Sequence, residues 1–311
     1  MRARTTTSEQ DEGQEAEMGR QLSEAIVDGI LGGSVYALMA VGLTLIFGVL
    51  DIINIAQGIL VVLGAYLSYV LSVHLHIDLF VGLLVTVPAM FIIGVAIQWA
   101  FIRPLRGRER TSMSLLATYA VAIIIEGLLY IIFGSNFVNL NASYTTSGPK
   151  IFGFYLDYIY IYGFLMALLF VAAIYFTLYR TQFGRSIRAT MQDHTAARIV
   201  GINVNRVQAL TFGIGVAVTA AGGMVFGATG GGFNPNTGYD LISRLLAIII
   251  LGGLGSIGGA MVAAIFMITL EGVVDVVWSP SWSVVVFYGA LVLVLAFRPQ
   301  GLFGRQAARA Q

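Results

Sequence analysis

Long apolar segments constrain this chain more than any other feature of its sequence. Residues 79–102 contain no charged side chain, and stretches of similar length recur along the chain. A helix needs about 20 mostly apolar residues to cross roughly 30 Å of hydrocarbon. The chain is 58% hydrophobic and 11% charged, whereas a soluble domain carries about 25% charged residues. These values exclude an aqueous enzyme and an intrinsically disordered chain, and they predict an all-α, polytopic membrane protein.

Nine segments are candidate membrane spans: 26–50, 52–73, 79–102, 112–134, 158–179, 207–229, 241–257, 260–278 and 282–297. The predicted count is eight or nine, because residues 241–278 could form a full hairpin or a partly re-entrant pair. We therefore expect one helix bundle over residues 25–305. An acidic polar tail precedes it over residues 1–24, which we expect to be disordered, and a short tail follows at 306–311.

The distribution of arginine predicts the orientation of the bundle. Most of the 17 basic residues gather in three places: Arg103, Arg106, Arg108 and Arg110; Arg180, Arg185, Arg188, Arg198 and Arg206; Arg298, Arg305 and Arg309. Basic loops stay in the cytoplasm, so the 180–206 loop and the C-terminus are predicted there. Residues 135–157 carry one cation, Lys150, and are predicted outside. Nine crossings then place the N-terminus outside, and eight place it inside.

The first apolar stretch that a lipid anchor would not tolerate lies at residues 47–58. Asp51, Asn54 and Gln57 recur there at i, i+3 and i+6, which would place them on roughly one face of a helix. Gly48 and Gly58 flank them as candidate helix breaks. Polar groups at membrane depth are costly unless they face a cavity or a partner. The segment is therefore either part of a substrate pathway or a short loop with Asp51 at the water interface.

A second interrupted stretch lies at residues 251–260. It contains five candidate helix-break glycines: Gly252, Gly253, Gly255, Gly258 and Gly259. Residues 253–258 match the G-x-G-x-x-G spacing of dinucleotide-binding loops, but that motif requires a soluble strand–turn–helix context. The flanking segments are apolar, so a tight turn or a close helix contact is expected instead. One interrupted segment near each end is typical of transporters built from two halves.

Three further carboxylates fall inside predicted spans. Glu126 lies near the middle of its span, where a carboxylate must be protonated or face a cavity, and it is a further candidate for the substrate pathway. Glu271 and Asp275 are spaced i, i+4 and share a helix face. They could form a coupled-ion site, pair with Arg244 or line a wet outer vestibule.

The 180–206 loop contains short stretches of amphipathic character, with apolar residues at Ile187, Met191, Ala196, Ile199 and Val200 and a predicted helix stop at Gly201. It is either a solvated connector or an element that docks on another protein. The chain has no P-loop motif, so an ATP-driven motor would have to be another polypeptide. It also has no cysteine, no histidine pair at metal-ligand spacing and a net charge of +1, so no metal, cofactor or nucleic acid is expected.

Several motifs together carry a family resemblance. They lie at 33–38 (GSVYAL), 47–58 (FGVLDIINIAQG), 64–66 (GAY), 103–106 (RPLR), 184–212, 251–261 and 299–305 (PQGLFGR). On these motifs the chain resembles the LivH-type permeases of branched-chain amino-acid ABC transporters over about residues 26–305. The resemblance implies a transport subunit without its own ATPase, embedded in the cytoplasmic membrane of a prokaryote. It implies import of branched-chain amino acids by alternating access, with permeases for urea, short amides or other amino acids as alternatives within the family.

The resemblance also implies partners: a second, LivM-like permease, two ATP-binding subunits and an extracellular solute-binding protein. In that family the long cytoplasmic loop couples the permease to the ATPase. By position, Asp193, Ala196, Ala197 and Gly201 fit the pattern of this coupling element, and Gln192 stands where the pattern usually has an acidic residue. The family often has His followed by Glu where this chain has Gln57, Gly58 and Ile59.

An ion-coupled secondary transporter that uses Asp51 or Glu126 is the alternative of a different class. It would need no ATP-binding partner, so the energy source separates it from the importer.

Overall fold

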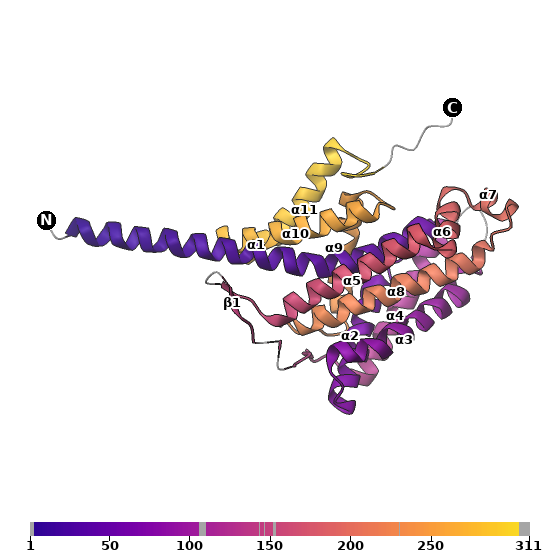
Figure 1. The fold of residues 1–311 in the computed structure, drawn as a ribbon, viewed down its shortest axis with the longest axis horizontal. Helices are drawn as coiled ribbons and strands as arrows, with labels where there is room; N and C mark the ends of the chain where they lie inside the picture. Colours follow the sequence, from indigo (N-terminus) through magenta and orange to yellow (C-terminus); the bar gives the residue numbers. More distant parts are fainter. Residues whose placement is uncertain are drawn as a thin grey trace.

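The computed structural model describes residues 3–105, 110–142, 144–145, 147–151, 154–229 and 231–304. These residues form an elongated bundle of helices (Figure 1). The helices are α1 (Ala3–Leu50), α2 (Gln57–Leu75), α3 (Leu79–Ile97), α4 (Arg110–Phe133), α5 (Tyr158–Arg180), α6 (Gln182–Gln192), α7 (His194–Ile199), α8 (Val204–Ala228), α9 (Thr237–Gly252), α10 (Ile257–Val277) and α11 (Pro280–Phe297). A π-helical segment, η1 (Gln98–Ile102), continues α3, and β1 (Lys150–Ile151) pairs antiparallel with β2 (Phe154–Tyr155).

Eight of the described helices are long and apolar enough to cross a membrane. The predicted all-α, polytopic class is therefore confirmed, with the lower of the two predicted counts. The segment predicted as a span at 241–257 is instead the 16-residue helix α9, which is shorter than the roughly 20 residues that a crossing needs. It follows Pro235 closely and ends beside Gly253, whose φ of 95° leaves the helical region.

The predicted disordered tail is not separate from the first span. Helix α1 is continuous from Ala3 to Leu50, and its N-terminal part projects beyond the bundle (Figure 1). Residues 14–22 consist mainly of Gln, Glu, Ala, Met, Arg and Leu, which cost little in a helix. They also extend a helix that is already formed, so the unfavourable nucleation step is not repeated. The composition predicts a solvated segment, and the backbone of that segment is helical because it continues α1.

Glycine allows the central helices to approach closely. A Cβ atom at Gly42 of α1 would overlap the side chain of Thr219 and the carbonyl of Gly215 in α8. In the same way, Gly64 of α2 lies against Ala220 of α8. Close backbone approach is how helices pack in lipid, where no hydrophobic force drives them together. The packing places α8 against both helices that flank the first interrupted stretch.

The two ends of the bundle are distinct. Helix α5 leads directly into α6 and α7, and α8 follows them, so the start of α5 and the end of α8 lie far from the α6–α7 loop (Figure 1). The middle of α1 packs on α10, with Gly29 against Thr269 and Gly33 against Ile265. Its last turn instead contacts the α6–α7 loop through Gly48 and Met191. The part of α1 that precedes Gly29 therefore lies toward the end opposite that loop.

Candidate functional site

The first interrupted stretch contains a chain of buried amide hydrogen bonds. Asn54 and Gln57 are both 0% exposed. Asn54 Nδ2 donates to Gln57 Oε1 at 2.8 Å, and Gln57 Nε2 donates to Thr219 Oγ1 at 2.6 Å. Thr219 in turn donates to the carbonyl of Gly215 at 2.7 Å. This amide network, comprising Asn54, Gln57 and Thr219, fastens the start of α2 to the middle of α8.

The network leaves one acceptor unpaired. Asn54 Oδ1 is buried and has no hydrogen-bond partner. A buried polar atom without a partner costs about 1–3 kcal/mol. In this conformation the segment therefore keeps one buried hydrogen-bond acceptor unsatisfied.

The predicted helical face over Asp51, Asn54 and Gln57 is wrong, because the residues between α1 and α2 are not helical. Asp51 is exposed and has φ 56°, a left-handed conformation that ends α1 and that Asp tolerates better than most residues. The two amides therefore point into the protein while Asp51 faces away from it. The interpretation of Asp51 as an interfacial loop residue fits this exposure, and Asn54 and Gln57 line no open channel in this conformation.

The two flanking glycines do not break helices either. Gly48 lies inside α1, where a Cβ atom would come 2.5 Å from Met191 Cε of α6. Gly58 lies in the first turn of α2, where a Cβ atom would overlap the carbonyl of Gly238 at the start of α9. Both positions are glycine because another element packs on them. The starts of α2 and α9 consequently lie against each other.

Glu126 lies at this same junction. Tyr239 Oη of α9 donates to Glu126 Oε2 at 2.6 Å, and both side chains line a small pocket together with Ile55 and Ile59. The backbone N–H of Ile55 donates to Thr118 Oγ1 of α4 at 3.2 Å. The structure thus brings Glu126 to the first interrupted stretch. Sequence reasoning did not identify Tyr239, whose position relative to Glu126 depends on the tertiary fold.

The second interrupted stretch is a tight turn, as predicted, and it is built from backbone. Gly253 and Gly255 have φ of 95° and 80°, and the N–H of Ser256 donates to the carbonyl of Gly253 at 3.0 Å. A Cβ atom at Gly252 would come 2.5 Å from Gly259. Gly258 contributes less, since its nearest neighbour is the hydroxyl of Tyr175 at 3.5 Å from a built Cβ.

The C-terminal segment closes this turn. The N–H of Leu302 donates to the carbonyl of Leu251 at 2.7 Å, and the N–H of Phe303 donates to the carbonyl of Gly252 at 3.3 Å. These two carbonyls belong to the last turn of α9, where the helix itself offers no partner. Residues 302–303 therefore cap α9 through main-chain bonds.

The predicted short amphipathic helices of the 180–206 loop are present as α6 and α7. Asp193 begins α7, accepting hydrogen bonds from the N–H groups of Ala196 at 3.1 Å and Thr195 at 2.6 Å. These two backbone bonds hold the pKa of Asp193 below its usual value. Gly201 follows α7 with φ 86°, as expected of the predicted stop.

The structure separates two neighbouring alanines that the family pattern treats together. Ala196 is exposed, but Ala197 is 2% exposed, so it faces its own chain and cannot meet a partner in this arrangement. A helix of six residues that rests on the bundle has one inner and one outer side, and adjacent residues fall on different sides. Gln192 and Asp193 are exposed, while Ile199 and Val200 are 81% and 73% exposed. The sequence identified Ile199 and Val200 as apolar residues of this loop, but it could not show whether they face the bundle or face away from it.

The loop contacts the last turn of α1. His194 Nε2 lies 2.9 Å from the carbonyl oxygen of Val49, which can only accept a hydrogen bond. The side-chain amide nitrogen of Gln208, in α8, lies 3.2 Å from the same ring nitrogen. One ring nitrogen cannot both donate to the Val49 carbonyl and accept from the Gln208 amide, so the tautomer of His194 selects between these two bonds. With Met191 seated at Gly48, α6 and α7 are attached directly to the residues that precede the first interrupted stretch.

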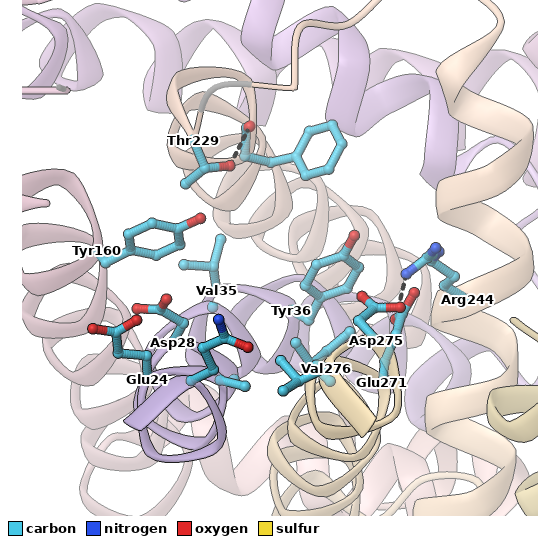
Figure 2. Close-up of a pocket in the computed structure, with 17 residues that line it drawn as sticks. Glu24, Asp28, Val35, Tyr36, Tyr160, Thr229, Arg244, Glu271, Asp275 and Val276 are labelled. Carbon is cyan, nitrogen blue, oxygen red and sulfur yellow. Dashed lines mark hydrogen bonds and ion pairs between the residues drawn. The ribbon is translucent and has the colours of Figure 1, made fainter. Parts of the chain in front are cut away.

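A cavity of about 510 Å³ lies at the end of the bundle opposite the α6–α7 loop. Figure 2 shows Glu24 and Asp28 of α1 beside Tyr160, and Glu271 and Asp275 of α10 beside Arg244 and Tyr36. Arg244 Nη1 donates to Glu271 Oε2 at 2.6 Å, so of the alternatives left open for the two carboxylates, pairing with Arg244 is present for Glu271. We call this cavity the vestibule.

Charge and shape limit what the vestibule accepts. Its lining carries four carboxylates against the single guanidinium of Arg244, while Val35, Ile268 and Val276 supply apolar wall. A cavity of several hundred Å³ has the size of a small-molecule site. An excess of carboxylates favours a group with positive charge over an anion.

A bundle of membrane-length helices with two short non-helical connections and a buried amide network has the architecture of a multi-pass membrane protein. The chain belongs to the family described as the permease component of the branched-chain amino acid transport system, whose model matches residues 25–295. No solved structure matches it.

Curated relatives agree with the family. The chain is 29% identical over 294 residues to the high-affinity branched-chain amino acid transport system permease protein BraD of Pseudomonas aeruginosa, covering 91% of this chain and 95% of that protein. It is 29% identical over 297 residues to LivH of Escherichia coli K12, with the same coverage. A shorter match, 31% identical over 146 residues, links it to LivM of the same organism and covers 46% of this chain and 34% of LivM.

Proposed function

We propose that this chain is the permease subunit of an ATP-driven ABC importer of branched-chain amino acids. The family match over residues 25–295 carries the proposal, and two relatives named for this transport system are similar over nearly their whole length. The proposed substrate class follows from those names. The proposed energy source follows from the family resemblance. Because this sequence has no P-loop motif, the proposed ATP-binding subunits are separate polypeptides.

The proposed partners are a second permease, two ATP-binding subunits and an extracellular solute-binding protein. Similarity to LivM over part of the chain supports a pair of related permeases. The outer side of the α6–α7 loop offers Ala196, Ile199 and Val200 as an apolar surface, which suits docking on an ATP-binding subunit better than it suits a solvated connector. We propose that this loop faces the cytoplasm of a prokaryotic cell, as its arginines predict.

With the loop in the cytoplasm, the vestibule faces outward and receives the solute. An aliphatic amino acid carries an ammonium and a carboxylate on an apolar side chain. Carboxylates such as Asp28 and Asp275 suit the ammonium, Arg244 suits the carboxylate, and the walls suit the side chain. The amide network is buried deeper in the bundle, whereas the Glu126–Tyr239 hydrogen bond is exposed. We propose that the amide network forms the closed part of the pathway in this conformation, with Glu126 at its edge.

Transport then proceeds by alternating access. Closure of the ATP-binding subunits pulls the α6–α7 loop, and the bundle moves between states that open the pathway to one side at a time. The solute needs only weak binding in the pathway, because the solute-binding protein can supply selectivity.

Purification followed by uptake into proteoliposomes tests the proposal. The chain is expected to copurify with ATP-binding subunits and to accumulate leucine, isoleucine or valine only when ATP and the solute-binding protein are supplied. Uptake of urea or a short amide under the same conditions would correct the substrate class. Uptake driven by an ion gradient without ATP would instead establish a secondary transporter that uses Asp51 or Glu126.

A further inference from the structure

The α6–α7 loop and the amide network are attached to opposite ends of one short segment. Residues 51–56 are not helical and connect α1 to α2. Immediately before them, the carbonyl of Val49 lies 2.9 Å from His194 Nε2. Immediately after them, Gln57 donates to Thr219 at 2.6 Å. Any displacement of the loop relative to α8 therefore acts across this segment.

The Val49 contact uses a carbonyl that the helix leaves free. The last four carbonyls of an α-helix have no partner within it, and α1 ends at Leu50. The carbonyl of Phe47 is taken by the N–H of Asp51 at 2.8 Å, and His194 takes the carbonyl of Val49. A carbonyl oxygen can only accept, so this contact is a hydrogen bond when His194 carries its hydrogen on Nε2. In that tautomer the bond ties the α6–α7 loop to the end of α1.

The far end of the segment is able to change its bonds. Asn54 Oδ1 is buried without a partner, and Ile52, two residues earlier in the same segment, is 1% exposed. An unsatisfied acceptor favours a second arrangement in which it is paired. A small rotation of residues 51–56 changes which atoms of Asn54 and Gln57 are bonded without unfolding either helix.

We infer that His194 is a positioning residue that transmits movement of the α6–α7 loop to the first interrupted stretch and its amide network. The inference rests on the proposed function, because the loop moves only if a motor acts on it. His194 contacts neither solute nor ATP in this mechanism. It fixes the end of α1 to the loop, so that motor closure changes the state of the network.

The experiment uses the complete transporter reconstituted with its ATP-binding subunits and solute-binding protein, carrying His194→Ala or His194→Gln. The Gln side chain can still donate to the carbonyl of Val49, whereas Ala cannot. His74→Ala is the control, since His74 is exposed near the end of α2. Uptake is measured beside ATP hydrolysis without solute. His194→Ala is expected to lower uptake about fivefold to tenfold, consistent with one lost hydrogen bond, while hydrolysis without solute stays unchanged. His194→Gln is expected to recover most of the uptake.

A labelling measurement separates this inference from the proposed function. The chain has no cysteine, so an Ile52→Cys variant carries one reactive thiol at a buried position. Maleimide labelling of that thiol is expected to be slow in the Ile52→Cys single variant and faster in the double variant that also carries His194→Ala. This readout needs no transport, so it still applies if the wild-type complex shows no ATP-driven uptake.

Three results would overturn the inference. The first is normal uptake in His194→Ala, and the second is unchanged labelling at position 52. The third is a joint loss of uptake and of hydrolysis without solute, or of copurification with the ATP-binding subunits, which would make His194 a docking residue.

Discussion

One interrupted stretch lies near each end of the chain, and the two differ in construction. Between α1 and α2, side chains carry the bonds: Asn54, Gln57 and Thr219 form the network, and His194 holds the end of α1. Between α9 and α10, glycines and main-chain bonds do so, with residues 302–303 capping α9. Side-chain bonds can exchange partners by small rotations, whereas the main-chain bonds that cap α9 break only if the C-terminal segment moves away. We therefore infer that the first stretch changes its conformation more readily than the second.

The largest expected effect is at the second stretch. Gly253→Ala combines a φ of 95° with overlap on Gly304, so strain and overpacking together should cost about 3 kcal/mol or more. We expect most of the protein to be lost from the monodisperse peak in size-exclusion chromatography. Gly255→Ala is the matched control, because its φ is 80° but nothing lies near the added Cβ. Equal losses in the two variants would show that packing against the C-terminal segment contributes nothing.

In the α6–α7 loop, which contacts the end of α1 before the first stretch, Ala196→Glu should abolish transport. A charge on the exposed side of α7 prevents docking but disturbs nothing inside this chain, so membrane insertion and thermal stability should match the parent. Ala197→Glu buries the same charge at a position that is 2% exposed, and we expect a lower melting temperature in addition. Normal uptake by Ala196→Glu would remove the docking role of this surface.

The amide network should affect transport more than stability. Replacing Asn54 and Gln57 together with Leu removes both polar partners and leaves Thr219 bonded to Gly215. Gln57→Leu alone leaves the amide nitrogen of Asn54 unpaired, so the single variant should be less stable than the double by about 1–2 kcal/mol. Thermal unfolding measures the difference, and we expect uptake to fall in both. Uptake at the parent rate in the double variant would identify these residues as packing only.

The smallest expected effect is a pH dependence at Asp193. Its pKa is lowered in the folded protein, so the carboxylate cap stabilises α7 at pH values above the usual Asp pKa. That stabilisation is lost as the pH falls through the lowered pKa. Amide hydrogen exchange of residues 194–199 should therefore speed up more at acid pH in the parent than in Asp193→Asn, whose side chain caps without titrating. The same pH profile in both would show that the carboxylate charge is not involved.

Much of the fold is predictable from apolar segment length, and both interrupted stretches are visible as polar or glycine-rich islands. Backbone conformation inside them is not. Periodicity predicts Asp51, Asn54 and Gln57 on one helical face because it assumes a continuous helix. It does not reveal that Asp51 adopts a left-handed conformation. Continuity of α1 through residues 3–24 is also hidden from composition, which reports solvation but not cooperativity.

The candidate site was predictable where it depends on local spacing. The i, i+4 pair Glu271 and Asp275 and their neighbour Arg244 do meet at one cavity. Tyr239, Glu24 and Asp28 join their sites from helices distant in sequence, so only the tertiary packing reveals them. Ala196 and Ala197 differ in exposure because one side of α7 rests on the bundle. Residue type and spacing do not indicate which side of the helix that is.

The main-chain cap on α9 has a consequence for biogenesis. Helix α9 leaves the ribosome well before Leu302 and Phe303 are synthesised, so its last carbonyls await partners until translation is nearly complete. The insertion machinery therefore handles an unfinished hairpin of α9 and α10 for the whole time that α11 is being made. A chain that ends just before Leu302 would contain every described membrane helix but would lack the two main-chain bonds that cap α9.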